Sequence, residues 1–161
     1  DATDCSMGPL IDDASVARVT SAIEGGVASG ADLLLDGRES ETPERGCFIG
    51  PTIFDNVPHD SALATEEIFG PVLSILRVET LDEAIDVTKR SRYGNMAVMF
   101  TSSGHAAARF KNTAGAGMIG IIVGVPAPMA VFPFTGWKES FFGTLHSNGE
   151  DSDKQQSWHR V

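Results

Sequence analysis

The feature that most constrains the fold is an alternation of short apolar runs with helix-forming segments. In the second half of the chain, apolar runs over residues 72–78, 97–100 and 118–123 are separated by two segments with helix signals. Strands whose faces are covered by crossover helices have this nearly continuous apolar character. The pattern therefore predicts an α/β fold with buried strands, in the order strand, helix, strand, helix, strand.

Capping residues mark where these two helices begin. Thr80 and Glu83 form a capping box, in which the Thr80 hydroxyl accepts from the Glu83 amide and the Glu83 carboxylate reaches back to Thr80, ahead of a helix over 81–91. Ser103 can cap an alanine-rich helix over 104–114 in the same way. Both helices are thus predicted with defined starting points.

The first half of the chain contains one long amphipathic segment and two further apolar runs. Apolar residues recur at spacings of three and four over 13–29, which predicts a helix that ends near Gly30. Residues 33–35 are predicted as a short strand, and 52–57 as a buried one. The polar residues 36–47 between them are typical of a solvated loop.

Composition excludes several classes of partner. The 161 residues carry a formal net charge of −10, which disfavours nucleic acid and anionic membranes. The most apolar stretch, 118–134, is interrupted by glycine and proline, and a membrane helix needs about 20 mostly apolar residues. The chain has two cysteines and no secretion signal at its first residues. We expect one globular domain in the cytoplasm, with no nucleic-acid or membrane partner.

The segment Glu66-Glu67-Ile68-Phe69-Gly70-Pro71-Val72 places two carboxylates and an aromatic ring just before a predicted strand. Taken alone, it is explained by solvated glutamates and a ring in the core. Its neighbours change that interpretation, because the wider pattern resembles the aldehyde dehydrogenase superfamily from residue 7 to about residue 145. The flanking motifs are Met7-Gly8-Pro9-Leu10-Ile11, Gly50-Pro51-Thr52-Ile53, Thr80-Leu81-Asp82-Glu83-Ala84-Ile85, Tyr93-Gly94-Asn95 and Phe100-Thr101.

The later part of the chain is most similar to the CoA-acylating methylmalonate-semialdehyde dehydrogenases within this superfamily. The similarity lies in Gly117-Met118-Ile119-Gly120, the proline-spaced Val125-Pro126-Ala127-Pro128, and the segment from Phe132 to Gly143. This resemblance implies a three-layer α/β/α catalytic-domain lobe over 1–145, without the nucleotide-binding domain. Residues 146–161 are too polar to be ordered by burial, so a disordered tail is expected there.

The resemblance also implies an activity. Members of the family oxidise malonate or methylmalonate semialdehyde with NAD and transfer the acyl group to coenzyme A, through a thioester on a cysteine. It implies that Glu67 hydrogen-bonds the nicotinamide ribose and that Phe69 helps to place that end of the cofactor. Glu67 and Phe69 are therefore the predicted cofactor-binding residues, and we expect both on an exposed rim that faces the absent domain.

Other parts of the family's machinery are absent from the sequence. The chain contains neither the Gly-x-x-Cys context of the nucleophile nor a glycine-rich turn that could hold a pyrophosphate. Cys5 lies in a polar amino end, and Cys47 begins a predicted strand where the family commonly has an aromatic residue. No residue is predicted to be catalytic, and the four histidines show no metal-ligand spacing.

Four positions depart from the family pattern. The family usually has glycine at Met96, glutamine at Met118, asparagine at Ile122 and proline at Gly124. Ile122 matters most, because the asparagine it replaces lies near the substrate end of the site in related enzymes. After residue 149 the chain also lacks the interface strand of the family, which leaves a homo-oligomer open.

Three hypotheses follow. The first is a fragment of an NAD-dependent, CoA-acylating semialdehyde dehydrogenase that is inactive alone. The second is a non-catalytic module that binds a full-length homologue through a face normally covered by the nucleotide domain. The third is a small thiol enzyme that uses Cys47, for which the sequence supplies no activating partner.

Overall fold

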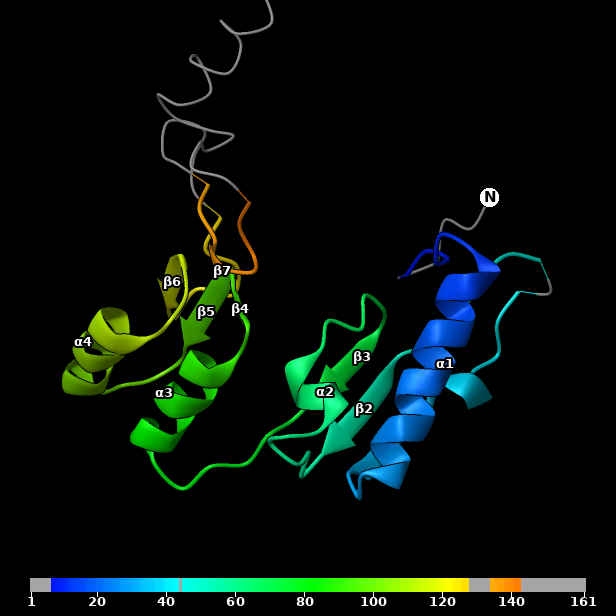
Figure 1. Cartoon of the computed structure of the whole chain (residues 1–161), viewed down its shortest axis with the longest axis horizontal. Helices are drawn as coiled ribbons and strands as arrows, with labels where there is room; N and C mark the ends of the chain where they lie inside the picture. Colours follow the sequence, from blue (N-terminus) through cyan, green and yellow to red (C-terminus); the bar gives the residue numbers. More distant parts are fainter. Residues whose placement is uncertain (1–6, 44, 128–133, 143–161) are drawn as a thin grey trace, which may run out of the picture. The chain divides into compact units, whose positions relative to one another are not determined.

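A computed structural model describes residues 7–43, 45–127 and 134–142. The chain divides into two compact units, Asp1–Arg77 and Val78–Val161, and each is described by itself (Figure 1). Cys5 and the predicted tail over 146–161 lie outside the described residues. Within the described ranges, no helix is both long enough and apolar enough to cross a membrane.

The first unit begins with helix α1, Asp13–Ala28, as the apolar spacing predicts. Asp12 caps the helix, because its carboxylate accepts from the Ser15 amide at 2.7 Å. The hydrogen bonds from Ser15 hold the pKa of Asp12 below its usual value. Val19 and Ile23 are fully buried, so this face of α1 forms the core of the unit.

Three strands form the sheet of the first unit, in the order β1-β2-β3. Strand β1 (Asp32–Leu35) is antiparallel to β2 (Thr52–Asp55), and β3 (Val72–Ser74) is parallel to β2. The predicted loop contains a short 3-10 helix, Gly37–Glu39.

Strand β3 differs from its prediction in both length and burial. It ends at Ser74 instead of Val78, and Leu73 is 56% exposed. The reason is its place at the end of the sheet, where among the described strands only β2 pairs with it. An apolar run therefore predicted the strand correctly but not its burial.

The short helix α2, Ala62–Thr65, packs against α1 through a close contact at Gly26. A methyl group at Gly26 would lie 2.5 Å from a Leu63 methyl carbon and 2.8 Å from the Phe54 ring. Phe54 and Leu63 belong to the same buried cluster as Val19 and Ile23. Glycine is therefore required where α1 meets α2 and the sheet.

The second unit contains the predicted alternation from its first helix onward, because the strand that precedes this helix, β3, belongs to the first unit. Helix α3 (Leu81–Arg90) begins at Thr80, whose hydroxyl accepts from the Glu83 amide at 3.2 Å. The Glu83 carboxylate accepts from the Glu79 amide at 2.8 Å, so the prediction that it reaches Thr80 was wrong. Either donor lies before the first turn, and the glutamate rotamer decides between them.

Strands β5 (Met96–Met99) and β6 (Met118–Ile121) run parallel and are joined by α4 (Gly104–Thr113). The Ser103 hydroxyl caps α4 by accepting from the Ala106 amide. One core cluster joins side chains of both helices to one face of both strands. Its members are Ile85, Phe110 and Ala114, with Leu81, Ala97, Met99, Ile119 and Ile121 packed against them.

These observations confirm the mixed α/β composition and the strand, helix, strand, helix, strand order. In the described part of the second unit, α3 and α4 share one face of the β5–β6 pair. The three-layer α/β/α lobe, the absence of a nucleotide-binding domain and the 1–145 boundary therefore stay predictions.

A two-stranded ribbon in the second unit was not predicted. Strand β4 (Tyr93–Gly94) pairs antiparallel with β7 (Trp137–Lys138). The Lys138 ammonium donates to the carbonyls of Thr88, Lys89 and Ser91 at 2.8–2.9 Å. These carbonyls lie at the carboxyl end of α3, where helical hydrogen bonding leaves acceptors unpaired and a positive charge is favourable.

Lys138→Met should destabilise the second unit by about 1 kcal/mol, because three carbonyls at the end of α3 lose a charged donor. Thermal unfolding followed by circular dichroism measures the loss. Lys111→Met is the matched control, since Lys111 is an exposed lysine in the last turn of α4. Equal destabilisation by both substitutions would show that the three contacts of Lys138 add nothing beyond its charge.

Candidate functional site

The segment Glu66–Gly70 connects α2 to β3 and is held at both ends by backbone hydrogen bonds. The Glu66 amide donates to the Ala62 carbonyl at 3.0 Å, which closes α2. At the other end, the carbonyl of Pro71 accepts from the Thr52 amide of β2 at 2.8 Å. The five residues between these anchors form the candidate site.

Arg18 of α1 holds the middle of this segment. Its guanidinium donates to the carbonyl of Ile68 and, at 3.5 Å, to the carbonyl of Phe69. Phe69 has a φ of +54°, in the left-handed region that non-glycine residues seldom adopt. Backbone strain of this kind persists where surrounding contacts over-determine the conformation, and it clusters at functional sites.

Gly70 brings the end of the segment against the buried face of α1. A methyl group at this position would lie 2.4 Å from a Val19 methyl carbon. Val19 is fully buried and cannot move aside without disturbing the core. Any residue larger than glycine would therefore push the segment away from α1.

Glu67 and Phe69, the two residues predicted to bind the cofactor, point away from the core. Glu67 is exposed, and Phe69 is 75% exposed although it is a large apolar ring. Ile68, between them, packs against the core cluster. The structure thus confirms that both side chains are exposed, and their role and the surface they face stay predictions.

The carboxylate of Glu67 remains available for an external donor. Among the described residues, no hydrogen bond or ion pair engages it, although Arg18 lies close enough to line the same small cavity. That cavity has a volume of about 220 Å³ and an apolar floor that includes Ala22, Leu63 and Ile68. A ribose has hydroxyl donors for the carboxylate, so the residues present fit the nicotinamide-ribose end of NAD.

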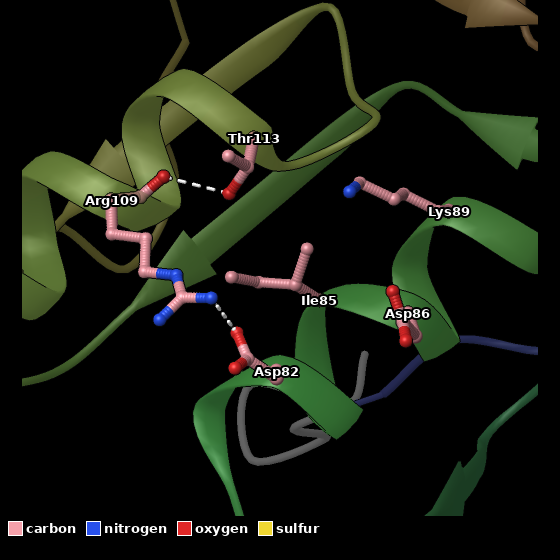
Figure 2. Close-up of a pocket in the computed structure, with 6 residues that line it drawn as sticks. All are labelled: Asp82, Ile85, Asp86, Lys89, Arg109 and Thr113. Carbon is pink, nitrogen blue, oxygen red and sulfur yellow. Dashed lines mark hydrogen bonds and ion pairs between the residues drawn. The ribbon is translucent and has the colours of Figure 1, made fainter.

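A second cavity, of about 340 Å³, lies between α3 and α4 (Figure 2). Its polar side chains come from both helices, and Arg109 forms an ion pair with Asp82 across it. The Thr113 hydroxyl donates to the Arg109 carbonyl at 2.7 Å. Arg109, Asp82 and Thr113 are already engaged by these contacts, which makes this cavity a weaker candidate than the segment Glu66–Gly70.

Cys47 does not have the surroundings of a nucleophile. It lies outside the strands, since β2 begins only at Thr52, so its predicted place at the start of a strand was wrong. Its thiol donates to the Asp13 carboxylate at 3.3 Å, and this hydrogen bond raises the pKa of Cys47. Because the thiolate is the reactive form, the geometry argues against the thiol-enzyme hypothesis.

Ile122, where the resemblance predicts a departure from the family pattern, has an unusual backbone. Its φ is +56° and its side chain is 63% exposed. The Ile122 amide donates to the Met99 carbonyl at 2.9 Å, which places it at the carboxyl ends of β5 and β6. A β-branched residue is strained in this conformation, whereas asparagine tolerates it well.

The described histidines do not form a metal site. His59 shares a hydrogen bond with the Arg77 carbonyl at 3.2 Å, and His105 is exposed. Across residues 7–43, 45–127 and 134–142, no three histidine, cysteine, aspartate or glutamate side chains come together in a way that could hold a metal ion.

Sequence reasoning did not find Arg18, which the structure places beside the predicted site. It lies 50 residues before Ile68, on the exposed face of α1. A single arginine on the polar face of an amphipathic helix gives no signal of its own, because such side chains are usually solvated. Only the packing of α1 against the segment Glu66–Gly70 reveals its partners.

Comparison with known proteins identifies the protein family of this chain. The model of the aldehyde dehydrogenase family matches residues 1–157. The malonate-semialdehyde dehydrogenases of Bacillus velezensis and Bacillus subtilis are 54% and 51% identical over 146 residues. That alignment covers 91% of this chain and 30% of each relative, so the chain spans about 30% of the length of these relatives.

Solved structures give the same result. A protein of Sinorhizobium meliloti 1021, assigned as a methylmalonate-semialdehyde dehydrogenase and crystallised with NAD, matches with a TM-score of 0.90 at 38% identity, over 95% of this chain and 32% of that one. The methylmalonate-semialdehyde dehydrogenase of Oceanimonas doudoroffii matches with a TM-score of 0.86 at 39% identity, over 90% of this chain and 30% of that one.

The fold and the sequence therefore define a chain of mixed α/β structure that matches about 30% of the length of aldehyde dehydrogenases. The chain belongs to the aldehyde dehydrogenase family. The relatives named above act, by their names, on malonate or methylmalonate semialdehyde, which confirms the subgroup that the sequence resembled.

Alkylation of Cys47 should be slow at neutral pH and should rise with pH later than alkylation of a free cysteine, because the raised pKa lowers the thiolate fraction. Asp13→Asn removes the largest cause of that shift, so the rate should increase at pH 8 and the pH profile should move to lower pH. Iodoacetamide kinetics in a Cys5→Ser background measure both. A pH profile unchanged by Asp13→Asn would contradict this account.

Ile122→Asn should stabilise the second unit by about 1 kcal/mol, because asparagine adopts positive φ with less strain than isoleucine. Urea unfolding provides the measurement. Val123→Asn is the control, since Val123 is also exposed and does not have a positive φ. A gain of the same size at Val123 would show that added polarity, not relieved strain, is the cause.

Proposed function

We propose that the segment Glu66–Gly70 holds the nicotinamide ribose in an NAD-dependent dehydrogenase of malonate or methylmalonate semialdehyde. Glu67 accepts hydrogen bonds from the ribose hydroxyls, and Phe69 packs beside that end of the cofactor. The observation that supports this most directly is the pair of exposed side chains at Glu67 and Phe69, the first unpaired among the described residues and the second on a left-handed backbone.

The chemistry of the site agrees with this assignment. NAD, when bound, accepts the hydride from the substrate. The residues of this chain contribute orientation, because a carboxylate that accepts from ribose hydroxyls fixes one end of the dinucleotide. The contacts of Arg18 limit the backbone conformations of the segment that carries Glu67, which reduces the entropy lost on binding.

The complete reaction of the full-length enzyme is part of the same proposal. The relatives are about three times as long as this chain, which covers 30% of them. Oxidation of the semialdehyde, the cysteine nucleophile and transfer to coenzyme A are proposed for the full-length enzyme, and none of the described residues is assigned to these steps. The chain alone is proposed to be inactive.

An interaction module is the second candidate, and a specific surface favours it. Leu35 and Leu73 are exposed and lie on the same side of the first sheet as Ile53, as the strand register shows. This side is opposite the face that Phe54 presents to the core. An uncovered apolar sheet face is a typical contact surface, here for a full-length homologue or a second copy.

Glu67→Ala should weaken NAD binding to the purified chain by at least about tenfold, because a hydrogen bond to a charged acceptor contributes about 1.5–3 kcal/mol. Isothermal titration calorimetry measures the affinity. Glu24→Ala is the control, as Glu24 is an exposed glutamate on α1. Equal affinities for Glu67→Ala and the unsubstituted chain would contradict the cofactor assignment, and absence of binding by the unsubstituted chain would favour the interaction module.

A further inference from the structure

We infer that Arg18 is a positioning residue, whose guanidinium fixes the backbone of Ile68 and Phe69 so that Glu67 and Phe69 face outward while Ile68 faces the core. This role goes beyond the proposed function and rests on it, because the value of the fixed conformation lies in presenting the carboxylate to the cofactor. The contacts are the two donations from Arg18 to successive carbonyls.

Contact with two successive carbonyls requires a backbone that is not extended. In an extended segment, successive carbonyls point to opposite sides, so one side chain cannot reach both. The φ of +54° at Phe69 breaks this alternation and brings the two carbonyls to the same side. The planar guanidinium has several N–H groups in a fixed fork, which suits two acceptors at once. The arginine and the left-handed residue thus depend on each other.

The clamp acts between two anchors that do not by themselves determine the conformation. On one side, the hydrogen bond of the Glu66 amide closes α2. On the other side, Gly70 packs against Val19, and the Pro71 carbonyl accepts a hydrogen bond from the Thr52 amide. Residues 67–69 between them have no strand partner. Without Arg18, Phe69 could leave the left-handed region and turn its ring towards the apolar surface of α1, which would also move Glu67.

The same contacts leave the charge of Glu67 free for a ligand. Arg18 and Glu67 line one cavity, yet the arginine donates to neutral carbonyls. An ion pair between these two side chains would occupy the carboxylate oxygens that a ribose needs. Because the guanidinium of Arg18 is bound to backbone carbonyls, the carboxylate of Glu67 stays available for a ligand.

The test compares Arg18→Met, Arg18→Lys and the control Arg90→Met, which removes an exposed arginine from α3. Amide hydrogen exchange reports on Glu66 and Val72, whose amides donate hydrogen bonds at the two ends of the segment, calorimetry with NAD reports on the affinity, and thermal unfolding reports on global stability. We expect Arg18→Met to speed exchange of these amides and to weaken NAD binding, each by about tenfold, with the unfolding temperature changed by less than about 3 °C. Arg18→Lys should restore part of both effects, because an ammonium can replace one donor of the fork.

The outcomes separate this inference from the proposed function. Unchanged exchange in Arg18→Met would overturn the positioning role, whatever Glu67→Ala does. Faster exchange with unchanged NAD affinity, while Glu67→Ala weakens binding, would also overturn it and leave the cofactor assignment standing. If the unsubstituted chain does not bind NAD, the proposed function fails, and the exchange comparison with Arg18→Lys decides whether Arg18 positions the segment.

Discussion

The contact between α1 and the segment Glu66–Gly70 is the constraint on which the candidate site depends. Val19 faces the core and leaves room only for a glycine, while Arg18, next to it on the helix, binds the carbonyls of Ile68 and Phe69. Two neighbouring residues of α1 thus supply both the apolar contact and the hydrogen-bond donor that hold the segment. The segment has no strand partner of its own between these contacts, so its conformation is imposed by the helix.

This arrangement explains how an exposed aromatic ring and an exposed carboxylate can be held in place without being buried. Their backbone is fixed by partners that approach from the core side, and their side chains are left on the solvent side. A binding site benefits from this separation, because the groups that meet the ligand need not also stabilise the fold.

The second unit uses distant residues in a comparable way. Lys138 completes the carboxyl end of α3 from about 50 residues further along the chain, and in doing so it fixes the β4–β7 ribbon beside that helix. Ile122 shows the opposite situation. Its backbone is left-handed and its amide donates to the Met99 carbonyl, although a β-branched side chain is poorly suited to this conformation.

The sequence by itself determined the α1, α3 and α4 helices, the positions of β1, β2, β5 and β6, and the family. These follow from spacing, caps and motifs, which act over a few residues. Tertiary structure decided the rest: that β3 is short and exposed, that Glu83 binds the Glu79 amide, that Tyr93 pairs with Lys138, and that Arg18 clamps the site. The physical reason is distance along the chain. Periodicity and capping depend only on residues that are close in the sequence. The partners of sheet edges and side-chain donors are set by how the helices and strands pack in space.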